Sequence, residues 1–115
     1  LQEMNFGHWE GRAWAAIAPA ELQAWTDDFA HYPPGSVAES GIDSNAESGE
    51  SVSHFMTRVA SAFDDLPRDA DTLWITHAGV IRAASLIAGG VRQLDDPGQW
   101  PLAAPAYGQW CKLNF

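Results

Sequence analysis

The sequence is poor in three features, and each shortage narrows the class of protein. Cys111 is the only cysteine among 115 residues, which excludes an intrachain disulfide and a thiolate-rich metal site and fits a reducing compartment. Six Lys and Arg stand against fifteen Asp and Glu, and the formal net charge of −9 repels nucleic acid and anionic lipid. No apolar run approaches the roughly eighteen residues that cross a bilayer, and no basic leader precedes a hydrophobic segment. We therefore expect a soluble, cytoplasmic protein without a nucleic-acid or membrane partner.

The residues that are abundant indicate one globular domain. Hydrophobic residues make up 46% of the chain and six are tryptophan, a composition that argues against global disorder. The length suffices for one domain at most. A small phosphorylated ligand remains compatible with the acidic charge, because a few donors in one cleft override a negative field nearby.

Two helices and a long loop are indicated in the first two thirds of the sequence. Residues 19–31 begin with proline and carry one apolar stripe, which predicts an amphipathic helix. Residues 32–49 are rich in Pro, Gly, Ser, Asn and acidic side chains without any period, which predicts a flexible acidic loop. Ser51 is a plausible N-cap for a second helix that Pro67 ends. One face of that helix is apolar: Val52, Phe55, Met56, Val59, Ala60, Phe63 and Leu66.

A strand, a turn and a helix are predicted around His77. Residues 73–76 begin with an uninterrupted apolar run, which favours a strand buried on both faces, although a helix would also hide such a run. Gly79 breaks the run, and residues 80–88 form a mostly apolar helical pattern that Gly89 and Gly90 end. Residues 106–115 are a weaker candidate for another strand.

His77 would then lie between a strand end and a helix start, where open α/β sheets bind ligands and free N–H groups favour an anion. A histidine that hydrogen-bonds loop backbone is the alternative.

Three separated motifs give that position a chemical meaning. They are the opening LQEMNFGHWEG, the GES segment at 49–51 and the THAGVIR segment at 76–82. In this order the chain resembles the histidine phosphatase superfamily, also called phosphoglycerate mutase-like, from Leu1 almost to its end. The opening and THAGVIR resemble the α-ribazole phosphatase branch in particular. The resemblance implies an α/β fold, a three-layer α/β/α sandwich.

The resemblance also assigns roles to individual residues. It makes Glu3 the general acid, His77 the second catalytic histidine and Ala78 the donor of a backbone N–H to phosphate. A general acid must be shielded enough to keep its proton near neutral pH, and Met4, Phe6 and Trp9 are the neighbours expected to shield Glu3. No metal and no organic cofactor is implied.

Other polar residues of the motifs receive supporting roles. Ser51 is assigned to helix capping and Glu50 to support of the site. Arg82 either lends positive potential or pairs with an acidic neighbour, and we leave it out of the catalytic set. The remaining polar side chains of the HWEGR segment are interpreted as surface or supporting groups: His8, Glu10 and Arg12.

The family's nucleophilic histidine, in an R-H-G or R-H-P motif, has no counterpart in this sequence. The resemblance therefore implies that residues 1–115 are an incomplete carboxyl-terminal portion of one histidine phosphatase domain. We expect a phosphomonoester hydrolase with a phosphohistidine intermediate, acting on a small phosphorylated metabolite such as α-ribazole 5′-phosphate, and inactive as this chain alone. Its partner would be the missing amino-terminal half. The alternatives are a non-catalytic module that binds a phosphorylated ligand or a protein, and a fragment without independent activity.

Overall fold

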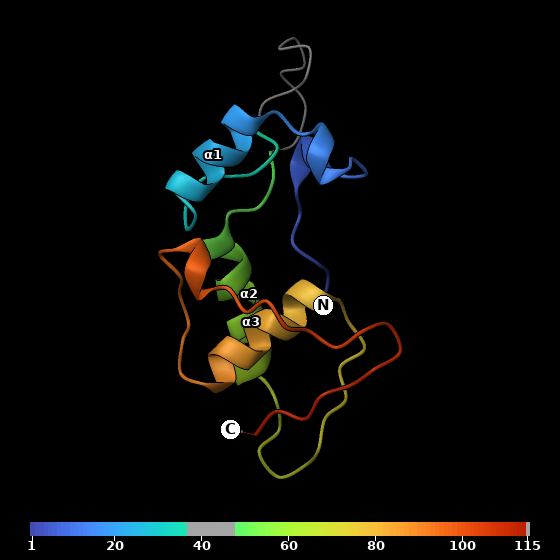
Figure 1. The fold of residues 1–115 in the computed structure, drawn as a ribbon. Coiled ribbons are helices and arrows are strands. Elements are labelled where there is room, and N and C mark those ends of the chain that lie inside the picture. Colours follow the sequence, from blue (N-terminus) through green and yellow to red (C-terminus); the bar gives the residue numbers. More distant parts are fainter. Residues whose placement is uncertain (37–47, 115) are drawn as a thin grey trace.

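The computed structural model of the chain describes residues 1–36 and 48–114, which form a helical structure (Figure 1). No β-strand occurs within these residues. The principal extents are 51 × 27 × 26 Å, so the molecule is elongated. Its helical elements are η1 (Gly7–Trp9), η2 (Trp14–Ala16), α1 (Pro19–Asp27), α2 (Val52–Asp64), α3 (Ala78–Ala88) and η3 (Pro97–Gln99), where η marks a short 3-10 helix.

Helix α2 forms the centre of the core, as its sequence predicts. The Ser51 hydroxyl accepts a hydrogen bond from the backbone N–H of His54 at 3.1 Å, which confirms Ser51 as the N-cap. The helix ends at Asp64, before the proline at position 67. Six of the seven apolar residues expected on one face are buried: Val52, Phe55, Met56, Val59, Ala60 and Phe63.

Helix α3 packs against α2, and its start and end fit the sequence (Figure 1). It begins directly after His77 and ends at the expected glycines. Gly90 has a φ of +92° and donates to Ile87 O at 3.0 Å, while Val91 N donates to Leu86 O at 2.8 Å. This is the Schellman arrangement, which a glycine at this position permits because it has no Cβ. The buried face of α3 consists of Val80, Ala83, Ala84 and Ile87.

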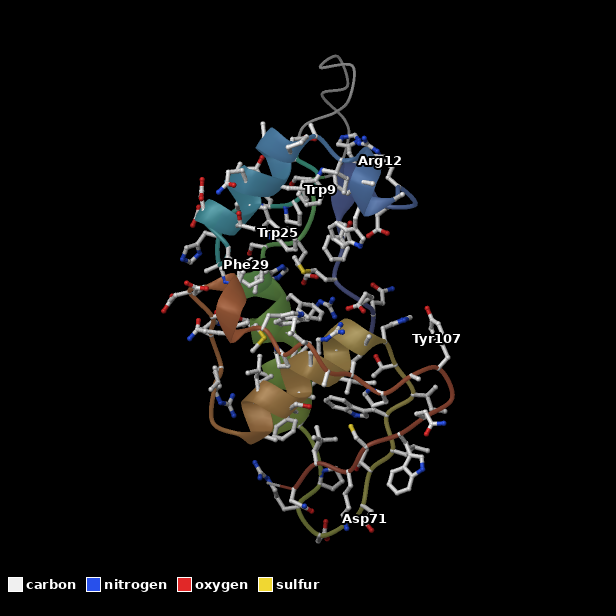
Figure 2. All side chains as sticks on the ribbon, viewed as in Figure 1. Trp9, Arg12, Trp25, Phe29, Asp71 and Tyr107 are labelled. Atoms are coloured by element: carbon white, nitrogen blue, oxygen red, sulfur yellow. The ribbon has the colours of Figure 1, made fainter. Side chains whose placement is uncertain are left out.

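Helix α1 is shorter than predicted, because Phe29, the last residue of the predicted apolar stripe, is buried from a position beyond the end of the helix. It covers nine residues with a proline at its start, and Phe29 lies beyond its end, buried and 5.3 Å from Trp25 between ring centroids. Trp25 also packs against Phe6, Trp9 and Trp14 at centroid distances of 5.7–6.2 Å. We call these five rings the aromatic cluster; three of them are labelled in Figure 2. The cluster attaches α1 to the amino-terminal segment.

Of the two flanks of the predicted acidic loop, the first is bonded to η1 and the second is bonded to the first. His8 N donates to Gly35 O at 3.1 Å, and Gly49 N donates to Pro34 O at 2.9 Å. Gly35 has a φ of +63°, and a Cβ there would overlap neighbouring backbone atoms, so this turn requires glycine. Residues 37–47, the greater part of the loop, lie outside the described residues.

The predicted strand at 73–76 is wrong for the described chain, and so is the weaker candidate over 106–114. Leu73 and Ile75 are 79% and 91% exposed, whereas Trp74 packs on Phe63 with centroids 6.4 Å apart. The Thr76 hydroxyl donates to Leu1 O at 3.0 Å. A strand exists only where a neighbouring backbone completes its hydrogen-bond ladder, and no described segment does so here. The expected three-layer α/β/α sandwich is therefore not present in the described residues.

A surface ion pair joins the end of α2 to the segment after α3. Arg92 donates two hydrogen bonds to the Asp64 carboxylate, at 2.6 and 2.8 Å. These hydrogen bonds, followed by the positive charges of Arg92 and Arg68, lower the pKa of Asp64 below its ordinary value of 3.8. Both side chains are about half exposed, so the pair contributes little to stability and is screened by salt.

We expect the exposed apolar face of residues 73–76 to cause self-association. Unpaired extended backbone flanked by apolar side chains is a template for intermolecular pairing. Replacing Leu73 and Ile75 by Thr should lower the aggregated fraction in size-exclusion chromatography with light scattering. Leu102→Thr, at an equally exposed position outside this segment, should change it less. A sharp monomer peak and cooperative melting of the wild type would contradict this expectation.

The Asp64–Arg92 pair predicts a specific pH dependence. Because the folded-state pKa of Asp64 is lowered, the stabilisation is present above the unfolded pKa and is lost as the pH falls through the folded pKa. Asp64→Asn should therefore reduce the free energy of unfolding slightly at pH 7, and this difference should vanish in acid below the folded pKa. Urea denaturation of both proteins across that range measures it. A difference that grows in acid would contradict the assignment.

Candidate functional site

The amino-terminal segment starts beside the beginning of α3 (Figure 1), and Glu3 contacts the helix there. One carboxylate oxygen of Glu3 accepts the backbone N–H of Gly79 at 2.8 Å, and the other accepts that of Met4 at 3.0 Å. The N–H groups in the first turn of a helix favour a negative group, and Glu3 fills that position here. A Cβ on Gly79 would overlap the Glu3 carboxylate, so the glycine of THAGVIR permits this close approach.

His77 and Ala78 lie at the same helix start. His77 is the N-cap residue of α3 with extended backbone angles, and its carbonyl accepts the N–H of Ile81 at 3.0 Å. Both side chains are exposed to solvent. Glu3 is therefore hydrogen-bonded to the helix start that carries His77 and Ala78, although Glu3 and Gly79 are 76 positions apart in the sequence.

Arg58 on α2 holds this segment in place, and sequence reasoning did not find it. Its guanidinium donates to Gln2 O at 3.0 Å and to Glu3 O at 3.1 Å. It also donates to both carboxylate oxygens of Glu50, at 2.8 and 3.0 Å. The sequence offered one signal for this contact. Glu50 directly precedes the Ser51 cap of α2, and Arg58 follows about two helical turns later.

Glu50 completes this arrangement, in line with the supporting role expected for it. Its side chain is only 8% exposed, and its carboxylate neutralises Arg58. Its backbone N–H donates to Asn5 O at 2.7 Å, which adds a second connection to the amino-terminal segment. The His54 ring also lies 3.4 Å from the Glu50 carboxylate.

A cavity of about 260 Å³ opens beside Glu3. Gly79 and Arg82 line it together with Met4 and Phe6, two of the residues expected to shield Glu3. Trp9, the third, is buried elsewhere, and four other rings line the cavity instead: Trp14, Trp25, Phe55 and Trp100.

Arg82 does not pair with a carboxylate in the part of the chain that the structure describes. Its Nη2 donates to the backbone carbonyl of Leu102 at 3.2 Å. Its Nε is buried, and no described atom accepts a hydrogen bond from it. Of the two roles weighed for Arg82, a source of positive potential fits this geometry and an acidic partner does not.

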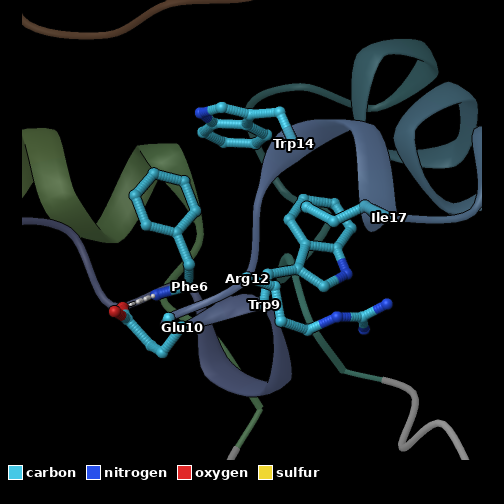
Figure 3. Close-up of a pocket in the computed structure, with 7 residues that line it drawn as sticks. Phe6, Trp9, Glu10, Arg12, Trp14 and Ile17 are labelled. Atoms are coloured by element: carbon cyan, nitrogen blue, oxygen red, sulfur yellow. Dashed lines mark hydrogen bonds between the residues drawn. The ribbon is translucent and has the colours of Figure 1, made fainter.

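A second cavity, of about 180 Å³, shares Phe6 and Trp14 with the first cavity in its lining (Figure 3). Its polar side chains serve the local backbone. Glu10 accepts the Phe6 N–H at 2.7 Å, and Arg12 donates to Ala16 O at 2.7 Å. These contacts agree with the supporting roles expected for the HWEGR segment.

Residues 1–36 and 48–114 contain no group of three or more His, Cys, Asp or Glu side chains placed to hold a metal ion. Within the same ranges, every helix is too short and too polar to cross a bilayer.

Free N–H groups at a helix start favour an anion, and the Glu3 carboxylate fills this position at α3, beside a cavity that Arg82 also lines. The family model of the histidine phosphatase superfamily (branch 1) matches residues 1–114. The chain therefore belongs to this superfamily, and the resemblance seen in the three motifs is confirmed at that level. Membership supports a phosphatase-type function in general. No curated protein and no solved structure gives a significant match.

Removing the Arg58 side chain should destabilise the fold and release Glu3. Arg58→Ala leaves a nearly buried Glu50 carboxylate without its partner, and we expect a loss of about 2 kcal/mol in the free energy of unfolding. The Gly79 amide resonance should shift, because the Glu3 backbone loses its hydrogen bond. Urea denaturation and NMR measure the two effects. Arg92→Ala, which removes an arginine from a surface pair, is the matched control; an equal loss there would contradict the assignment.

Proposed function

We propose that this chain is the acid-bearing part of a phosphomonoester hydrolase that works through a phosphohistidine intermediate. Glu3 is the general acid, His77 stabilises the transition state and the Ala78 N–H binds the phosphoryl group. The observation that carries the proposal is the hydrogen bond between the Glu3 carboxylate and Gly79 N, since it places the candidate acid at the helix start that follows His77. The superfamily match supports the same reaction class.

The chemistry follows from this arrangement. A phosphate group at the α3 start lies beside the Glu3 carboxylate, and the two negative charges repel unless Glu3 carries a proton. The nucleophilic histidine forms a bond to phosphorus, the bond to the leaving oxygen breaks, and the Glu3 proton passes to that oxygen. Water then attacks phosphorus, the bond between phosphorus and the histidine nitrogen breaks and returns its electron pair to the imidazole, and Glu3 takes up the proton that water loses. An imidazolium at His77 would donate to the phosphoryl oxygen on which negative charge builds.

The nucleophile must come from outside the motifs of this chain, since the sequence has no R-H-G or R-H-P segment. We propose that a further segment, from the same domain or from a second polypeptide, supplies it on a strand. Pairing of that strand with residues 73–76 would give their backbone donors and acceptors partners and complete an α/β/α sandwich. The chain alone is then inactive. The motif opening at Leu1 favours α-ribazole 5′-phosphate as the substrate, and a cytoplasmic location is consistent with the single cysteine.

A non-catalytic phosphate-binding module is the second candidate. The observation that favours it is the absence of the nucleophile motif together with a solvent-exposed α3 start, where an anion would compete with the Glu3 carboxylate for the first-turn N–H groups. Both candidates predict phosphate binding, and only the first predicts turnover.

Phosphatase assays separate the two candidates. The purified chain is tested alone and after co-expression with a segment that carries an R-H-G strand, using p-nitrophenyl phosphate and an alkyl phosphate. We expect activity only in the combination, and His77→Ala should abolish it. Glu3→Gln should lower alkyl phosphate hydrolysis by about 100-fold or more and affect p-nitrophenyl phosphate less, because p-nitrophenolate leaves without a proton.

Glu21→Gln, on α1, is the control for loss of a carboxylate and should keep full activity. A folded complex without activity would favour the binding module. Turnover by the chain alone would show that it contains its own nucleophile.

A further inference from the structure

The segment that follows η3 crosses α3, and Arg82 connects the two (Figure 1). The segment begins at Trp100, whose ring centroid lies 6.4 Å from that of Phe55. Two residues further on, the Leu102 carbonyl accepts a hydrogen bond from Arg82 Nη2 at 3.2 Å. We propose that residues 101–105 are a strap that Arg82 holds closed over α3, and that a phosphate group at the α3 start opens it by taking Arg82 from Leu102. The proposal rests on the proposed function, since it takes phosphate as the releasing ligand.

The guanidinium of Arg82 is only half satisfied while the strap is closed. Nη2 and Nε lie on one edge of the guanidinium, and such an edge binds two oxygens of one anion side by side. The Leu102 carbonyl occupies Nη2, whereas Nε is buried and finds no acceptor in the described ranges. A buried donor without a partner is costly. The closed arrangement therefore leaves this edge with one of its two acceptors.

The strap contributes little apolar burial to the closed arrangement. Leu102 is 96% exposed, and Ala103 is exposed as well. Pro101 and Pro105 bound the strap, and neither can donate a backbone N–H. Because apolar burial is what usually holds a segment on a protein surface, this strap depends on its hydrogen bond from Arg82 instead.

Arg82 is also placed to serve a ligand at the α3 start. It follows Ala78 by four positions, so both residues lie on one face of the helix. Helical side chains lean toward the amino terminus of their helix, and Arg82 lines the same cavity as Gly79. Glu3 lines this cavity too, but its carboxylate already accepts two backbone N–H groups.

Phosphate and the closed strap therefore compete for one edge of Arg82. Two phosphate oxygens would satisfy both Nη2 and Nε, whereas the Leu102 carbonyl satisfies Nη2 alone. Since Nε is covered while the strap is closed, a ligand reaches it only when the strap moves. Binding of phosphate to Arg82 and opening of the strap are thus one event.

A spin label on the strap of the intact chain measures its position. Cys111→Ser removes the only cysteine, and Ala103→Cys then carries a nitroxide label. We expect the label to broaden the NMR signals of α3, including the Arg82 Nε–H. Saturating inorganic phosphate should shift the Ala78 and Gly79 amides and reduce the broadening about two-fold or more. Sodium chloride at equal ionic strength screens charge but offers no paired oxygens, so the broadening should persist.

Variants of Arg82 test the latch itself. Arg82→Gln loses the charge and the reach of the guanidinium, so the strap should open without phosphate. Arg82→Lys keeps the charge and a donor but has no two-donor edge, so phosphate should open its strap less. Arg92→Gln, which removes an arginine from the surface pair with Asp64, is the matched control and should keep the strap closed. Equal broadening in Arg82→Gln and wild type would show that Arg82 does not hold the strap.

Phosphate affinity gives an independent readout. Opening the strap costs part of the free energy of binding, so a strap that is already loose should raise the affinity. Replacing Pro101 and Pro105 by Gly should loosen the strap and tighten phosphate binding by roughly two- to five-fold in an NMR titration. Pro67→Gly, outside the strap, is the control and should leave the affinity unchanged. Equal affinity in all three proteins would contradict the competition.

The outcomes separate this inference from the proposed function. Phosphate that shifts the Ala78 and Gly79 amides while the strap stays closed would overturn the strap and leave the phosphate site intact. A label that does not broaden α3 in the otherwise wild-type chain would overturn the strap as well. If phosphate changes neither the amides nor the broadening, the phosphate site and the inference fail together.

Discussion

The Arg58 guanidinium is the interaction on which the rest of the site depends. Arg58 is the one side chain of α2 that donates to the backbone of both Gln2 and Glu3, so it fixes an otherwise irregular segment against the core. Backbone carbonyls at such a position need donors, and a guanidinium provides several in a fixed plane. Glu50 balances its charge with a bidentate contact. With the segment held in this position, the Glu3 carboxylate accepts a hydrogen bond from Gly79 N at 2.8 Å.

The aromatic cluster fixes the other side of the same segment. Trp25 on α1 contacts Phe6 and Trp14, which follow Glu3 in the chain, so α1 and α2 together hold the amino-terminal residues from two sides. Glycines allow the close approaches that this arrangement needs, at Gly35 beneath η1 and at Gly79 beneath Glu3. The cavity beside Glu3 is lined by Phe6, Trp14 and Trp25 of the aromatic cluster and by Phe55 of α2.

Local patterns predicted the elements that depend on local interactions. The Ser51 cap, the apolar face of α2 and the glycine end of α3 each involve residues within a few positions of one another. The prediction of a strand at 73–76 was wrong because an apolar run indicates only a tendency toward burial. A strand also needs a partner backbone, and no local sequence pattern shows whether one is present. Glu3 was singled out through the motif resemblance alone, and its role as general acid stays a prediction. The contacts of Arg58 were missed because they join it to Gln2 and Glu3, which lie 56 and 55 positions earlier in the sequence.

The net charge of −9 decides how such a site must gain its affinity. A phosphate ester approaching an acidic chain receives no long-range attraction, and at physiological salt the repulsion is screened beyond about 8 Å. Under the proposed function, phosphate binding then depends on donors within contact distance: the first-turn N–H groups of α3 and the Arg82 guanidinium. Two other arginines are already committed, Arg58 to Glu50 and Arg92 to Asp64. Arg82, which pairs with no described carboxylate and lines the cavity beside Glu3, is therefore the cation on which the proposed phosphate site depends.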